Sequence, residues 1–110
     1  MPDIICVTTL NASTYLAFDG EKDRLNRQKH GISLWFAQQI DWSLVWSAPD
    51  TRRDYGELRE IGFVPVSRRL YCVVFTQRGR QLRIISLRKA SNREITRYEQ
   101  CVKPGSKYRR

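Results

Sequence analysis

The stretch over residues 70–76 constrains the fold most, because nearly every one of its positions is apolar. Neighbouring side chains of a strand point to opposite faces, so this stretch presents apolar groups on both. Strands of that kind lie in the middle of a sheet. The loop at residues 77–80 contains Gly79 and predicts a hairpin into a partner strand over residues 82–87. The core is therefore expected to form around a central antiparallel pair.

Helix signals lie on both sides of this hairpin. Asp19 is a suitable N-cap for a helix that ends near His30, where Gly31 can adopt the left-handed conformation. Ser33 is expected to cap a second, shorter helix. The side chains that this short helix has available for burial are those of Leu34, Phe36, Ala37 and Ile40, with Trp35 pointing elsewhere.

The last helix has the most specific start signal. Ser91 and Glu94 have the S-x-x-E spacing of a capping box, which predicts a helix from there to about Val102. Its buried stripe is expected to consist of Ile95, Tyr98 and Val102. A basic tail follows over residues 104–110.

Three further short strands complete the predicted elements, over residues 15–18, 43–47 and 61–66. Pro65, near the end of the last of these, suits an edge strand or a strand terminus. The order strand, two helices, sheet, helix predicts an α+β fold, in which the helices pack on one face of a small antiparallel sheet. With 110 residues the chain fits one domain, expected over residues 14–103, and residues 1–13 are an extension of uncertain order with strand character at 4–7.

Compartment and metal use can also be inferred. The apolar runs are too short for a membrane helix, and the N-terminus lacks the basic region of a signal peptide, so a cytoplasmic protein is expected. Three cysteines, Cys6, Cys72 and Cys101, form no C-x-x-C pair and are interpreted as buried free thiols. With a single histidine, no zinc site and no cofactor are predicted.

Charge points to the partner. Twenty Lys and Arg residues against eleven Asp and Glu residues give a net charge of +9, and the pI is about 10. Such an imbalance favours a polyanion as ligand. A merely soluble basic protein is the alternative, and a membrane surface fits less well because no amphipathic helix combines a basic face with a large apolar one.

Several cations have positions that suggest a role. Lys22, Asn26 and Lys29 are spaced i, i+4, i+7 and share one helical face. Arg88 and Lys89 precede the last helix, where free N–H groups favour a phosphate. Arg83 is five residues from Arg88, so in one regular strand the two would face opposite sides.

Other candidates have two or more interpretations. His30 is either an acid–base group or a helix-terminal side chain. Arg93 and Arg97 form a like-charged i, i+4 pair that could meet RNA, a protein partner or solvent. Trp35 and Phe36 suggest an exposed apolar patch and thus a partner site.

Several blocks of the sequence resemble one protein family. The first consists of Phe18-Asp19, Lys22, Asn26 and residues 29–33, and resembles the F/W-D-x-x-K-x-x-x-N-x-x-K-H-G-V-S opening of the BrnT-type toxins. Residues 75–79 and 83–90 resemble the Y-T-x-R-G and R-I-I-S-A-R-K-A blocks, and Glu94 with Tyr98-Glu99 matches the closing E-R-x-x-Y-E. The resemblance covers roughly residues 16–100. The chain departs from the pattern at Trp35-Phe36, usually an acidic pair, at Arg68, usually Gly, and at Ile95, usually Arg.

The resemblance implies a RelE-like fold and metal-independent cleavage of RNA. It also implies a ribbon-helix-helix antitoxin that forms a heterotetramer with the toxin and carries its only contact with DNA. The hypothesis assigns Arg83, Arg88 and His30 to catalysis, with Lys29 and Tyr98 as other acid–base candidates. Phosphate contacts are assigned to Lys22, Lys29, Arg78, Lys89 and Arg93, and antitoxin contacts to Trp35, Phe36 and Arg97. The alternatives are a non-catalytic nucleic-acid-binding module and an interaction protein that regulates its operon.

Overall fold

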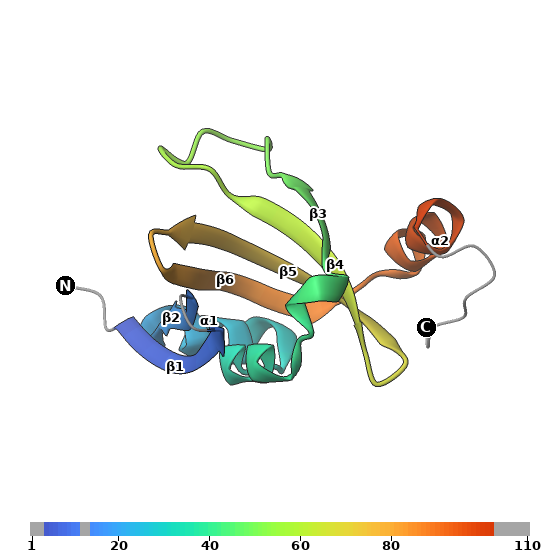
Figure 1. Ribbon diagram of the computed structural model, residues 1–110. Coiled ribbons are helices and arrows are strands. Elements are labelled where there is room, and N and C mark those ends of the chain that lie inside the picture. The colour runs from blue at the N-terminus through green and yellow to red at the C-terminus, as the bar shows by residue number, and fades with distance from the viewer. Residues whose placement is uncertain (1–3, 12–13, 103–110) are drawn as a thin grey trace.

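The computed structural model describes residues 4–11 and 14–102 of the chain. Within them a mixed sheet has the strand order β1-β2-β6-β5-β4-β3 (Figure 1). Its strands are β1 (Ile4–Asn11), β2 (Thr14–Asp19), β3 (Trp46–Pro49), β4 (Glu60–Val66), β5 (Arg69–Arg78) and β6 (Gln81–Lys89). The helices are α1 (Gly20–His30), the 3₁₀ helices η1 (Leu34–Gln39) and η2 (Trp42–Leu44), and α2 (Asn92–Cys101). None of the helices in these residues is long and apolar enough to cross a membrane.

The α+β class and the central hairpin are confirmed. β5 lies between β6 and β4 and pairs with both in the antiparallel sense. Gly79 has a φ of 57° and forms the short connection between β5 and β6. One pair differs from the predicted antiparallel sheet, because β2 runs parallel to β6. A strand's own pattern shows which side chains are buried, whereas its neighbour and direction depend on how distant segments pack.

The helix boundaries follow the local signals. Asp19 accepts a hydrogen bond from the Glu21 N–H, and Gly31 ends α1 with a φ of 72°. Both halves of the capping box at Ser91 and Glu94 are present at the start of α2.

The strand predicted over residues 43–47 is wrong in its position, because the structure has β3 over Trp46–Pro49. Asp41 accepts hydrogen bonds from the Ser43 N–H at 3.1 Å and the Ser43 hydroxyl at 2.6 Å, which caps the helical turn η2. The extended segment therefore begins only at Trp46. Pro65 lies in β4 beyond the residues that pair with β3, where its missing N–H costs no bond on that side.

The N-terminal segment contributes a strand. β1, within the extension expected over residues 1–13, pairs with β2 and forms one edge of the sheet. The proposed tail at residues 104–110 lies outside the described residues. The division into extension, domain and tail therefore stays a prediction.

The two faces of the sheet are covered differently. Leu34 and Ala37 of η1 pack on the face that carries Val64, Val73 and Ile84. A second cluster joins Leu70 of β5 to Ile95 and Tyr98 of α2. Leu70 and Val73 are three positions apart in one strand, so the two clusters lie on opposite faces. The expectation that all helices pack on one face is therefore wrong for α2, which lies at the sheet end away from the β5–β6 turn (Figure 1).

The cysteines are only partly as expected. Cys72 is buried in β5, and burial raises the pKa of its thiol to about 11. Cys101 is exposed, because it lies off the buried stripe of α2. The side chain of Cys6 lies outside the described residues.

Candidate functional site

A β-bulge in β6 determines which basic side chains share a face. The pairs Val74–Ser86 and Phe75–Ile84 leave Ile85 as an extra residue on β6. The alternation of sides therefore shifts by one residue between Arg83 and Arg88. Arg88 pairs with Cys72 and Arg83 with Thr76, so both arginines lie on the same face. The prediction of opposite faces assumed a regular strand and is wrong.

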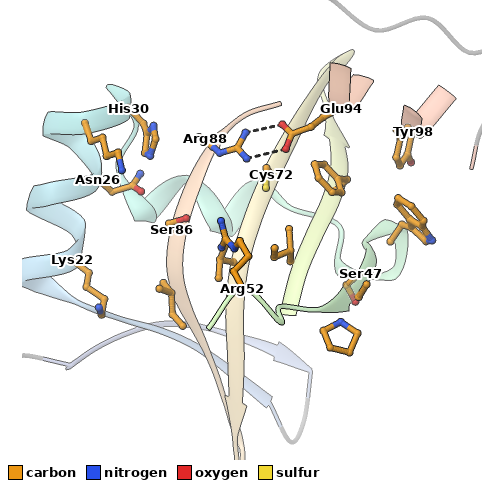
Figure 2. A pocket seen from close by; sticks show the side chains of 18 of the residues that line it. Lys22, Asn26, His30, Ser47, Arg52, Cys72, Ser86, Arg88, Glu94 and Tyr98 are labelled. Carbon is orange, nitrogen blue, oxygen red and sulfur yellow. Dashed lines mark hydrogen bonds and ion pairs between the residues drawn. The ribbon is translucent and has the colours of Figure 1, made fainter. Parts of the chain in front are cut away.

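This face forms the floor of a cleft with a volume of about 970 Å³. Cys72 and Val74 from β5, together with both bulge residues Ile85 and Ser86, line the floor. α1 contributes one wall, and α2 with β3 contributes the other. Figure 2 shows Lys22, Asn26 and His30 on the α1 side, Tyr98 on the far side, and Arg88 with Glu94 between them.

The α1 wall carries the predicted i, i+4, i+7 face, since Lys22, Asn26 and Lys29 all line the cleft. Asn26 is buried and fixes this wall to the sheet. Its amide donates to the carbonyls of Leu87 and Ile32, each at 2.8 Å, and its oxygen accepts from the Leu87 N–H at 3.1 Å. The two lysines thus line the cleft from a helix that hydrogen bonds of Asn26 fix to β6.

His30 also lines the cleft, at the end of α1. Gly31 rather than His30 closes the helix, since its N–H donates to the Arg27 carbonyl. Partial burial, followed by the positive charges of Lys29 and Arg88, lowers the pKa of His30 below its ordinary value of 6.5. The neutral imidazole therefore predominates at neutral pH and can accept a proton.

Arg88 has a fixed orientation in the middle of the cleft. Its Nη1 and Nη2 donate to the two carboxylate oxygens of Glu94 at 2.8 and 2.9 Å, and Nη1 also donates to the Lys89 carbonyl at 3.3 Å. The hydrogen bonds from Arg88, with those from Ser91, hold the pKa of Glu94 at about 2 although burial opposes the shift. Glu94 is therefore ionised at neutral pH and serves as a rigid holder for the guanidinium group.

Arg52 is a cleft residue that the sequence analysis missed. Its guanidinium forms a bidentate pair with the buried Asp50, with both contacts at 2.8 Å. The bond from Arg52 lowers the pKa of Asp50. The pair lies in the irregular segment after β3, where neither residue belongs to a periodic pattern. No sequence signal could have shown that Arg52 reaches the cleft.

The structure gathers some of the predicted site residues in the cleft and leaves others outside it. The members in the lining are Lys22, Lys29, His30, Arg88, Arg97 and Tyr98. Arg83 lies on the same face towards the hairpin, where its Nη2 donates to Gln81 at 3.2 Å. Arg78 pairs with Glu57 at the hairpin end, and Lys89 and Arg93 are exposed but do not line the cleft.

The residues assigned to the antitoxin are separated. Trp35 is 45% exposed on η1 and touches Phe18 edge-on. Phe36 is half-buried against Tyr71 on the face that η1 covers. Arg97 lines the cleft on the opposite face. Tyr98, the other acid–base candidate, is a core residue with 2% exposure.

The fold and the cleft define a small, basic α+β protein in which several cationic side chains line one cleft, as a site for a polyanion requires. In residues 4–11 and 14–102, no three His, Cys, Asp or Glu side chains come together as a set of metal ligands.

The family comparison identifies the class further. A family model described as the ribonuclease toxin, BrnT, of a type II toxin-antitoxin system matches residues 18–94, well over half of the chain. The chain therefore belongs to the BrnT family, is a ribonuclease toxin that acts on RNA, and has a cognate antitoxin. A comparison with curated proteins finds no match.

Proposed function

We propose that the cleft holds a strand of RNA and cleaves it without a metal ion. The observation that carries the proposal is the convergence of His30, Lys29 and Arg88 in one cleft from two separate elements. A base, a proton donor and a fixed cation are the groups that metal-free cleavage of a phosphodiester requires.

In this mechanism His30 removes the proton from a ribose 2′-OH. The 2′-oxygen attacks the adjacent phosphorus, and the bond from phosphorus to the 5′-oxygen of the next nucleotide breaks. Lys29 protonates that leaving oxygen, which gives a 2′,3′-cyclic phosphate and a free 5′-OH. Lys29 fits this role better than Tyr98, because the Tyr98 side chain is almost fully buried.

Arg88 stabilises the charge on the pentacoordinate phosphate. Among the described residues, Glu94 and the Lys89 carbonyl occupy three of its five N–H donors. The edge formed by Nε and the second Nη2 hydrogen remains for two phosphate oxygens, the bidentate geometry for which arginine is suited. Because Glu94 already fixes the guanidinium group, little reorganisation is needed when charge develops.

The remaining cations extend this path along the RNA. Arg83 is four residues of β5 away from Arg88 in register, a Cα separation of about 13 Å at roughly 3.3 Å per residue. We therefore assign Arg83 to a neighbouring phosphate, and Lys22, Arg78, Lys89 and Arg93 to flanking ones. These contacts add affinity that falls with salt.

The test is cleavage of protein-free RNA by the purified protein with EDTA present. We expect Arg88→Ala to lower kcat by about 100-fold or more, as does loss of a group that stabilises a transition state. Arg24→Ala is the matched control, because Arg24 is an exposed arginine of α1 paired with Glu21 and outside the cleft lining. Full activity of both Arg88→Ala and His30→Ala would place the chemistry elsewhere, and loss of wild-type cleavage in EDTA would refute only the metal-free step.

The pH profile tests His30 separately. Because its pKa is lowered, we expect kcat/KM to fall as the pH drops through a value below 6.5. The residual activity of His30→Gln should lack this limb. If the acidic fall in kcat/KM persists in His30→Gln, it arises from a group other than His30.

For the partner, we propose a ribbon-helix-helix antitoxin that assembles with the toxin as a heterotetramer and provides its contact with DNA. Trp35 supports a docking point because a large apolar side chain is exposed on η1. Half-buried Phe36 would contribute its edge there, and Arg97 would bind an acidic segment in the cleft. Co-purification of the two proteins should weaken with salt and with Trp35→Ala, and binding that is insensitive to both changes would refute this interface.

A further inference from the structure

The cleft is chemically asymmetric. Its α1 wall presents Lys22, Lys29 and His30, whereas the opposite wall presents the indole ring of Trp46 on β3 together with Arg97 of α2. Trp46 is 41% exposed although it lines a cleft whose floor is largely apolar. An RNA strand has the same two-sided chemistry, with phosphates on one side and flat apolar bases on the other.

Trp46 is held in place by other aromatic side chains. Its ring centroid lies 6.3 Å from that of Phe63 at an interplanar angle of 38°, and 6.3 Å from that of Tyr98 at 67°. Tyr98 belongs to the small core that anchors α2, and Phe63 packs against that core. The indole is therefore positioned by the sheet and by α2 together, while Trp46 remains 41% exposed.

The other tryptophans differ from Trp46. Trp42 is half-buried and contacts Phe75 edge-on at 5.3 Å between ring centroids. Trp35 is as exposed as Trp46, but it lies on η1 and outside the cleft lining. Of the three, Trp46 alone combines an exposed ring with a place in the cleft.

We propose that Trp46 is a nucleobase-stacking residue, which binds an unpaired base of the RNA next to the cleaved phosphate and contributes to the choice of cleavage site. The inference rests on the proposed function, because it takes the α1 wall and Arg88 as the path of the phosphates. Base stacking requires the RNA to be single-stranded at this point, since a paired base cannot offer its face. The substrate class is thus single-stranded RNA or an unpaired loop.

The first experiment measures binding of a single-stranded oligonucleotide that carries 2′-deoxyribose throughout and so cannot be cleaved by attack of a 2′-OH. We expect Trp46→Ala to raise Kd by about 5- to 150-fold, the range for loss of one stacked base. Trp46→Phe should retain most of the affinity. Trp35→Ala is the matched control and should leave Kd unchanged, because the same side chain is removed from an equally exposed site outside the cleft.

The second experiment replaces one base at a time by an abasic sugar in the same oligonucleotide. At one position the abasic sugar should weaken binding strongly for the wild type and not at all for Trp46→Ala. The reason is that the base and its stacking partner act as one pair. Additive losses at every position, or equal Kd values for Trp46→Ala and Trp35→Ala, would overturn the proposal.

Two measurements distinguish a failure of the Trp46 stacking proposal from a failure of the proposed cleavage site. Thermal unfolding of Trp46→Ala and Trp46→Phe shows whether a loss of affinity reflects a loss of folded protein. If Arg88→Ala abolishes cleavage while Trp46→Ala matches Trp35→Ala, the stacking subsite fails and the cleavage site stands. If Arg88→Ala and His30→Ala cleave like the wild type, the proposed function itself fails.

Discussion

The two faces of strands β4, β5 and β6 come from alternating residues of the same chain, yet they differ in almost every property. On the face under η1, Val64, Val73, Ile84 and Leu87 are wholly buried in one apolar cluster. On the other face the strands form the floor of an open cleft, with Arg88 and Ser86 beside Cys72 and Val74. One face of this small sheet therefore buries a continuous apolar cluster, while the other stays open as a cleft.

Helices explain the difference between the faces. The short η1 places Leu34 and Ala37 on the apolar face and buries both completely. α1 and α2 flank the other face rather than cover it, so the space between them remains accessible. The hydrogen bonds of Asn26 hold α1 to β6. α2 is anchored both by the packing of Ile95 and Tyr98 on Leu70 and by the Arg88–Glu94 pair.

The largest expected effect is on the apolar face. Ile84 is 0% exposed, and Ile84→Ala should lower the free energy of unfolding by about 2–5 kcal/mol in a urea titration. Ile61→Ala on the cleft face is the matched comparison and should cost clearly less, because that side chain is partly exposed in the folded protein. Equal losses of unfolding free energy for the two variants would refute the claim that the two faces contribute differently to stability.

Asn26 lies at the border between the two faces, and Asn26→Ala should affect both stability and activity. The change leaves the buried backbone groups of Leu87 without their partner, which should cost about 2–3 kcal/mol in the free energy of unfolding. Cleavage by the folded fraction should also fall, because the lysine-bearing wall is no longer fixed. Gln28→Ala, at an exposed position of α1, should stay within about 0.5 kcal/mol of the wild type. A tolerated Asn26→Ala would show that packing alone holds the wall.

The acid stability of the Arg88–Glu94 pair isolates the electrostatic contribution of the cleft face. The folded-state pKa of Glu94 is about 2 against an ordinary value of 4.5, so its stabilisation is complete above pH 4.5 and is lost as the pH falls towards 2. Solvent screening of this partly exposed pair reduces the expected loss to about 1–2 kcal/mol. Glu94→Gln should remove this component from the pH dependence of unfolding, and identical pH profiles would refute it.

The smallest expected effect lies away from both faces, in the turn between β4 and β5. Arg68 has a φ of 66°, a left-handed conformation that glycine adopts more readily. Arg68→Gly should therefore raise the free energy of unfolding by about 0.5–1 kcal/mol and leave cleavage unchanged. Arg53→Gly removes the same charge from an exposed position without positive φ and should give no stabilisation. Equal effects of the two changes would point to charge instead of conformation.

Parts of the site could be predicted because they depend on neighbours in the sequence. The caps at Asp19, Gly31 and Ser91 lie where expected, since a cap involves residues only a few positions apart. The same holds for Lys22 and Lys29, which helical periodicity brings to one wall. The resemblance to BrnT toxins needed only the order and spacing of these sequence blocks, and the family match confirms it.

Other parts needed the folded chain. The extra residue Ile85 shows as a bulge only when β6 is paired with β5, and it alone brings Arg83 and Arg88 to the same face. Arg52 reaches the cleft through an irregular segment, and Trp46 faces it because β3 starts after the turn capped by Asp41.

The sequence by itself thus determined the family, the polyanionic partner, the helix ends and the cationic face of α1. The tertiary structure decided the parallel pair β2–β6, the position of α2 and the place of Trp46 across the cleft from the α1 cations. The physical reason is range: caps and periodicity are set by bonds between near neighbours, whereas strand register and cleft walls are set by contacts between distant residues.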